Sequence, residues 1–141
     1  MTLLDHVLVP VASEDDAEAT VAALAPYLDE INRVTAVHVI EKGGGTIDKA
    51  PLEKRREDAA EYLAVVEARL DGDAAVDTRI DYGTDVVDAL FAAAADAGAT
   101  ALAFRPRSGS RIVRLLSGDT ATRLTTAPVL PVVSLPDPGR E

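Results

Sequence analysis

Short apolar runs alternate along the chain with longer segments whose apolar residues recur every three or four positions. Short runs bounded by turn residues predict strands, and the longer periodic segments predict amphipathic helices. Strands that alternate with helices are typical of a parallel sheet, in which each helix crosses from one strand to the next. The strands expected from this pattern are 6–11, 33–40, 76–82, 99–104 and 129–135.

The expected helices carry recognisable end signals. Acidic residues Asp15 and Asp16 begin the first helix, and Pro26 bends or ends its last turn. Pro51 begins the second helix, Thr84 or Asp85 caps the third, and a short fourth helix begins near Asp119. Glycines 72 and 98 are expected just beyond the second and third helices. The residues expected on the buried faces are Ala17, Val21, Leu24, Leu28, Leu52, Ala59, Leu63, Val66, Leu70, Val86, Val87, Leu90, Phe91 and Ala94.

Two strands differ in their surroundings. The first, 6–11, is apolar throughout, as in a strand that is covered on both faces. In the strand 76–82, charged residues alternate with uncharged ones, which favours a half-exposed edge position. No linker or repeat divides the chain, so we expect one α/β domain over residues 1–141.

Composition restricts the possible functions. The chain has no cysteine, so disulfides, thiolate metal sites and cysteine catalysis are excluded. No apolar run approaches the length of a membrane helix, and the first residues lack a secretory signal, so we expect a cytoplasmic protein without membrane insertion. The formal net charge of −10 disfavours nucleic acid as a partner. The high Asp count and only three lysines favour a salt-adapted microbe as the source.

One segment, residues 105–123, is basic although the chain as a whole is acidic. Five arginines (105, 107, 111, 114 and 123) lie within nineteen residues, where Asp119 is the only acid. In parallel sheets ligands bind beyond the carboxyl ends of the strands, where the strand order reverses. This segment and the loop 12–14 are expected there, which predicts a site for a small anion or for an acidic segment of a partner. The alternative is that these arginines pair with the acidic surface.

No arrangement of residues points to catalysis. The only histidines, His6 and His38, are expected in or near strands as packing or surface residues. Metal-ligand spacing and a nucleophile motif are both missing from the sequence. We therefore expect a protein that is not an enzyme.

Three segments of the sequence together resemble the universal stress protein family. They are Asp96 to Phe104, Arg107 to Gly118, and Ala127 to Leu130 near the C-terminus. The similarity spans roughly residues 5–135. The resemblance implies a three-layer α/β/α fold, nucleotide-binding α-hydrolase-like, with a five-stranded parallel sheet in the order 3-2-1-4-5. It also implies a regulatory or sensor role.

Many members of that family bind ATP through Gly-x2-Gly-x9-Gly followed by Ser or Thr. Aligned on Gly118, this sequence has Arg105 and Ser108 at the other two glycine positions and Asp119 at the Ser or Thr position. ATP-binding members also carry an acidic residue after the first strand, and this sequence has Ala12 there. The motif is therefore degenerate. An adenine nucleotide remains a candidate cofactor through a rearranged phosphate loop, and a further alternative is an accessory domain of a membrane transporter. The candidate binding residues are Val11, Ala12, Ser13, Val39, Arg105, Arg107, Ser108, Gly109, Ser110, Gly118, Asp119 and Thr120.

The resemblance also implies a partner. In that family the fifth strand lies at the sheet edge and often pairs with its counterpart in a second subunit, so a homodimer is expected. Because Pro131 has no N–H, we expect it to face the outer edge and to weaken pairing there. The expected interface residues are Val129, Leu130, Val132, Val133 and Leu135.

Overall fold

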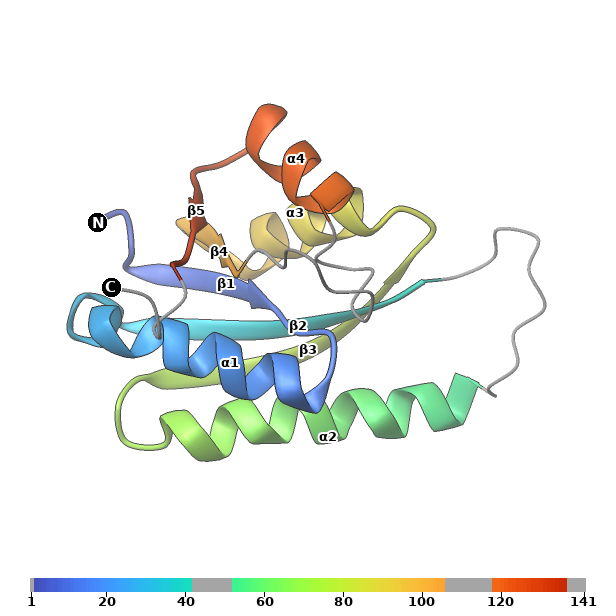
Figure 1. Cartoon of the computed structure of the whole chain (residues 1–141), viewed down its shortest axis with the longest axis horizontal. Helices are drawn as coiled ribbons and strands as arrows, with labels where there is room; N and C mark the ends of the chain where they lie inside the picture. The colour runs from blue at the N-terminus through green and yellow to red at the C-terminus, as the bar shows by residue number, and fades with distance from the viewer. Residues whose placement is uncertain (1, 42–51, 106–117, 137–141) are drawn as a thin grey trace.

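Five parallel strands form one sheet in the order β3-β2-β1-β4-β5 (Figure 1). The structure is a computed structural model, which describes residues 2–41, 52–105 and 118–136. The predicted α/β fold and strand order are confirmed. The strands are β1 His6–Pro10, β2 Arg33–Glu41, β3 Ala75–Gly83, β4 Ala101–Phe104 and β5 Val132–Ser134.

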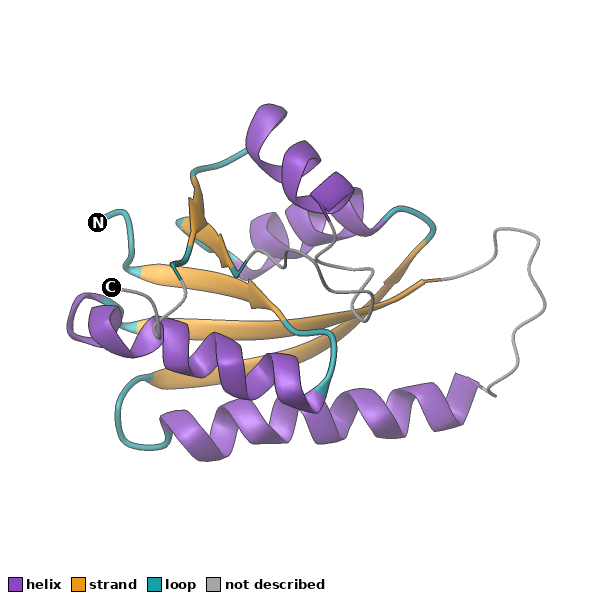
Figure 2. Cartoon of the chain, viewed as in Figure 1, coloured by secondary structure: helices purple, strands orange, loops and turns teal. Residues whose placement is uncertain are grey.

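Helices cover both faces of the sheet (Figure 2). α1 and α2 pack on one face over an apolar cluster that includes Val9 and Val66, and α3 and α4 lie on the other over a cluster that includes Leu8 and Phe104. In the described ranges, no helix is both long and apolar enough to cross a bilayer. The helices are α1 Glu14–Leu24, the 3-10 helix η1 Ala25–Glu30, α2 Leu52–Leu70, α3 Val86–Ala97 and α4 Gly118–Thr126.

The helix ends follow the local signals in the sequence. Pro26 lies in the first turn of η1, where α1 gives way to 3-10 geometry, as the missing proline N–H predicts. Asp85 is the N-cap of α3, and its carboxylate accepts a hydrogen bond from the Asp88 N–H. Gly98 ends α3 with a φ of +77°, a backbone conformation that glycine adopts without strain.

Three expectations about packing are wrong. β5 contains only Val132–Ser134, and Val129, which was expected within it, is 76% exposed. Leu52 is 49% exposed because it lies at the first position of α2. Pro131 faces β4 rather than the outer edge, since its carbonyl accepts a hydrogen bond from the Leu102 N–H. Proline is tolerated there because the position precedes the strand, where the ladder needs no N–H.

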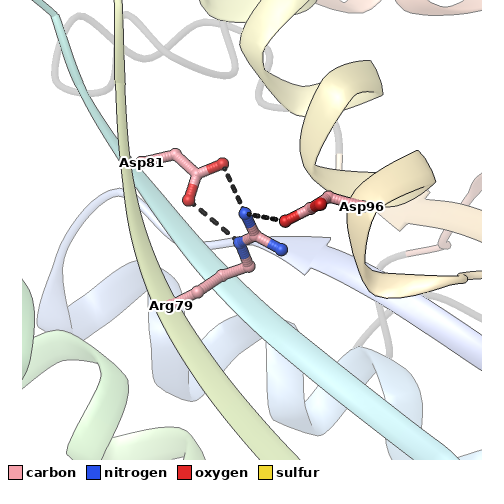
Figure 3. A network of polar contacts seen from close by, with 3 residues as sticks. All are labelled: Arg79, Asp81 and Asp96. Atoms are coloured by element: carbon pink, nitrogen blue, oxygen red, sulfur yellow. Dashed lines mark hydrogen bonds and ion pairs between the residues drawn. The ribbon is translucent and has the colours of Figure 1, made fainter.

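The edge position predicted for strand 76–82 is confirmed, since β3 is the outermost strand of the sheet and pairs with β2 alone among the described strands. Figure 3 shows how this edge is tied to the neighbouring helix. The Arg79 guanidinium donates to Asp81 on β3, with 2.9 Å between Nε and Oδ1, and to Asp96 on α3, with 3.0 Å between Nη2 and Oδ2. These charges keep the outer strand polar and hold it against α3.

Candidate functional site

The carboxyl ends of β1 and β4 lie side by side at the centre of the sheet (Figure 1). The connection after β1 leads to α1 on one face, whereas β4 is reached from α3 on the other face. The strand order therefore reverses between these two strands, which is where sheets of this type hold ligands. Ala12 and Ser13 follow β1 at this point, and Arg105 follows β4.

An ion pair joins the two loops across this point. Asp16 in the first turn of α1 is fully buried, and its Oδ1 lies 3.3 Å from Nη2 of Arg105, whose side chain is 16% exposed. The other carboxylate oxygen, Oδ2, accepts a hydrogen bond from the Ala12 N–H at 2.9 Å. The Ser13 hydroxyl in turn accepts from the Asp16 N–H at 3.1 Å. Asp16 thus fixes the loop after β1 and holds Arg105 at the switch point.

Arg105 has donor capacity left after this pairing. A guanidinium carries five N–H groups, and the 3.3 Å contact with Asp16 is longer than the usual 2.7–2.9 Å of a charge-assisted hydrogen bond. Its Nε is buried and has no hydrogen-bond partner among the described residues. A buried donor without an acceptor costs about 1–3 kcal/mol, so an oxyanion that reached this nitrogen would be favoured.

The other described candidates at the first loop are largely engaged within the protein. Val11 is fully buried, its N–H donates to the Val37 carbonyl at 2.8 Å, and its own carbonyl accepts from the His38 ring. Val39 is 4% exposed within the core on the α3 face, and Ala12 packs against the same cluster. Among the candidates in the loop after β1 and directly after β4, a ligand would therefore find its polar contacts at Arg105 and at the Ser13 hydroxyl.

Part of the predicted site lies outside the described residues, namely Arg107, Ser108, Gly109 and Ser110. The next three candidates, Gly118, Asp119 and Thr120, form the first turn of α4. Of the two alternatives left open for the basic segment, pairing with carboxylates describes both of its arginines that lie in the described ranges, Arg105 and Arg123. Arg105 pairs with Asp16, and Arg123 lies 2.9 Å from the Asp85 carboxylate and 4.0 Å from that of Asp88.

Arg123 has a structural role. Together with the N–H of Asp88, which contributes more, its guanidinium lowers the pKa of the Asp85 carboxyl. Because Asp85 caps α3 and Arg123 lies on α4, this contact joins the two helices of one layer. Sequence reasoning left pairing of these arginines open as an alternative but identified neither Asp16 nor Asp85 as a partner. Only the Ser-x-x-Asp spacing of Ser13 and Asp16 pointed to Asp16, and that spacing predicts a helix cap rather than an ion pair.

Both histidines are half-buried and hydrogen-bonded. Nε2 of His6 lies 2.7 Å from the Thr35 hydroxyl, and Nδ1 of His38 donates to the Val11 carbonyl at 2.7 Å. Burial lowers the pKa of each ring, and a nearby arginine lowers it further in both cases. Within residues 2–41, 52–105 and 118–136, no group of three His, Cys, Asp or Glu side chains is placed to hold a metal ion.

The lowered pKa values of the two histidines predict how the free energy of unfolding depends on pH. Their folded-state pKa lies below the unfolded value of 6.5, so the unfolded chain binds more protons once the pH falls to that value. The free energy of unfolding should be unaffected by the histidines above about pH 7.5 and should decrease as the pH falls through 6.5 toward the folded-state pKa values. Urea unfolding at about pH 7.5 and about pH 5.5 measures this. His38→Asn should reduce the loss, and an unchanged loss would contradict the assignment.

A hollow of about 220 Å³ lies on the α1 face beside β5. Its lining is almost entirely apolar, which makes it unsuited to an anion and distinct from the site at Arg105. No local sequence pattern indicates this hollow, because residues far apart in the chain line it. The lining residues are Leu3, Leu4, Val7, Leu24, Tyr27, Ile31, Ala103, Val133, Ser134, Leu135 and Pro136.

Solved structures share this fold, although no protein-family profile and no curated protein sequence matches the chain. A universal stress protein family member from Burkholderia pseudomallei is 22% identical, with a TM-score of 0.74 over 96% of this chain and 98% of that one. The Archaeoglobus fulgidus universal stress protein in complex with dAMP is 19% identical, with a TM-score of 0.64 over 96% and 100%. An Arabidopsis thaliana family protein with AMP bound is 16% identical, with a TM-score of 0.58 over 93% and 90%. The chain therefore has the fold of the universal stress proteins.

Proposed function

We propose that the protein is a cytoplasmic, non-catalytic regulatory module of the universal stress protein type that binds a phosphate-bearing ligand at the carboxyl ends of β1 and β4. The observation that supports this most strongly is the half-buried Arg105, which Asp16 holds at the switch point and whose buried Nε has no partner among the described residues. An adenine nucleotide is the candidate ligand, because structures of the same fold hold AMP, dAMP or cAMP.

The charge balance at Arg105 limits what this residue contributes. Asp16 neutralises the guanidinium, so the pair attracts an anion by hydrogen bonding more than by net charge. Three further arginines of the same segment, at 107, 111 and 114, would supply the remaining positive charge. We therefore propose a shared site in which Arg105 fixes the position of one phosphate oxygen and the following arginines provide the attraction.

The proposed binding mode differs from that of a glycine-rich phosphate loop. Glycines let a phosphate approach the backbone closely, whereas Arg105 places a long side chain at the first of those positions. The acid expected at position 12 is replaced by alanine, and the buried carboxylate of Asp16 lies 2.9 Å from the Ala12 backbone nitrogen instead. Since that carboxylate is already bound to Arg105, we infer that side-chain guanidinium groups hold the phosphate.

Titration calorimetry in high potassium chloride tests this proposal. AMP, ATP and sulfate should each release or absorb heat with saturable binding, and the double variant Arg107→Ala/Arg111→Ala should bind about tenfold more weakly, the equivalent of about one charge-assisted hydrogen bond. Arg33→Ala is the control, since Arg33 lies at the opposite, amino end of β2. A chain that binds none of the three compounds, or equal losses in the two variants, would refute the proposed function.

We further propose that the protein forms a homodimer through the outer edge of β5. Because Pro131 and Leu135 bond to β4, alternation along the strand directs the N–H groups of Val132 and Ser134 outward, where no proline interrupts them. Val129 and the half-buried Val132 and Val133 supply apolar surface beside this edge. Leu135, in contrast, is 4% exposed within its own chain and is not available to a partner.

Light scattering coupled to gel filtration measures the oligomeric state. Ser134→Pro removes one outward N–H and should convert the dimer to a monomer, whereas Ser134→Ala keeps the N–H and should remain dimeric. Circular dichroism should show that both variants are folded. A monomeric parent chain, or a Ser134→Pro variant that remains fully dimeric, would rule out pairing at this edge.

A further inference from the structure

His38 lies on β2, one strand away from the switch point, yet it is bonded to the loop that forms the site. Its Nδ1 is 2.7 Å from the Val11 carbonyl oxygen. A carbonyl can only accept, so Nδ1 carries the proton and donates it. The ring also packs edge-to-face on Tyr62 of α2, with 5.3 Å between the ring centroids and 75° between the planes. Two contacts therefore fix the orientation of the imidazole.

The Val11 carbonyl belongs to the same peptide group as the Ala12 N–H. That N–H donates to Oδ2 of Asp16 at 2.9 Å, so the single peptide unit is held by His38 on one side and by Asp16 on the other. Oδ1 of Asp16 then holds Arg105. A continuous series of hydrogen bonds thus connects His38 on β2 to the guanidinium after β4.

We propose that His38 is a positioning residue for the anion site, which sets the place of Arg105 through the Val11–Ala12 peptide group and Asp16. This inference rests on the proposed function, because it assigns His38 to the same site. Without the Nδ1–H the peptide unit is held on the Asp16 side alone, and the Ala12 N–H holds Asp16 less firmly in the orientation that meets Arg105. The charged side chains that act on the ring are Asp16 from α1 and Arg55 from α2, and Tyr62 is the titratable ring against it.

Two substitutions separate this role from simple packing. His38→Asn can place its side-chain NH2 where Nδ1–H now donates, but it loses the ring. His38→Phe keeps a ring against Tyr62 but has no donor. If His38 positions the loop, Asn should retain sulfate affinity within about twofold, and Phe should lower it about tenfold, the size expected for one lost buried hydrogen bond. If His38 only fills space, Phe should be the better substitute.

Sulfate is the probe because it does not titrate near neutral pH, and its affinity is measured by NMR titration of the full chain. A second measurement needs no ligand. In urea unfolding, His38→Phe and Arg105→Ala should be non-additive, with an interaction of at least about threefold in the unfolding equilibrium constant. The control pair, His38→Phe with Arg33→Ala, should be additive.

The sulfate titration and the double-mutant cycle test different claims. A parent chain that binds no sulfate refutes the proposed function, and the mutant cycle still decides whether His38 acts on Arg105. Retention of affinity by Phe with loss by Asn, equal effects of both substitutions, or additivity with Arg105→Ala would each overturn the positioning role.

Discussion

Arg105→Ala should lower the free energy of unfolding by about 3 kcal/mol and abolish sulfate binding. The cost is large because the fully buried Asp16 carboxylate loses the guanidinium that faces it, and removing one member of a buried ion pair is strongly unfavourable. Urea unfolding measures the change. Added sulfate should stabilise the parent chain and should leave the variant unchanged, since a ligand stabilises only the folded state that binds it.

Arg33→Ala is the matched control for this experiment. Arg33 also pairs with an aspartate, at 2.5 Å from Asp77, but the two side chains are 46% and 56% exposed. An exposed pair contributes about 1 kcal/mol at most, so this variant should unfold almost like the parent chain. If the two arginine variants lost equally little stability, Arg105 would have to be solvated and the description of the site would be wrong.

Phe104→Ala should lower the free energy of unfolding by about 4 kcal/mol, which is typical of a large aromatic side chain removed from a well-packed core. Phe104 is 1% exposed, belongs to the cluster on the α3 face, and ends the strand from which Arg105 emerges. Thermal unfolding followed by circular dichroism should show a large decrease in Tm.

Leu52→Ala provides the comparison, because the sequence pattern places Leu52 in the core whereas the structure leaves it 49% exposed. This substitution should change the free energy of unfolding by less than about 0.5 kcal/mol. A loss as large as that of Phe104→Ala would mean that the first turn of α2 is packed as the periodicity alone suggests.

Local patterns were sufficient to predict most of the fold. The apolar face of α3 is buried as the periodicity indicates. Pro26 marks the end of α1 and Gly98 the end of α3, as the sequence predicts. Such features depend on residues within one or two turns of each other. Leu52 shows where this reasoning fails, because a residue in the first turn can continue the apolar stripe of a helix and yet remain exposed.

The site was predictable only in part. The switch point between β1 and β4 follows from the order of elements, and the run of arginines placed Arg105 among the candidates there. Its pairing with Asp16 joins residues 89 positions apart, and no local pattern encodes a contact of that kind. The same holds for the bond between Arg123 and Asp85, which links two helices. Charge counting locates a basic segment, but only the three-dimensional arrangement shows which carboxylates face it.

A crystal structure of the chain grown with AMP would show whether Arg105 holds the phosphate. We expect a phosphate oxygen within about 3 Å of Nε of Arg105, between the loop after β1 and the first turn of α4, with Asp16 still bound to the same guanidinium. AMP bound at the apolar hollow beside β5, or a nucleotide whose phosphate does not contact Arg105, would contradict it.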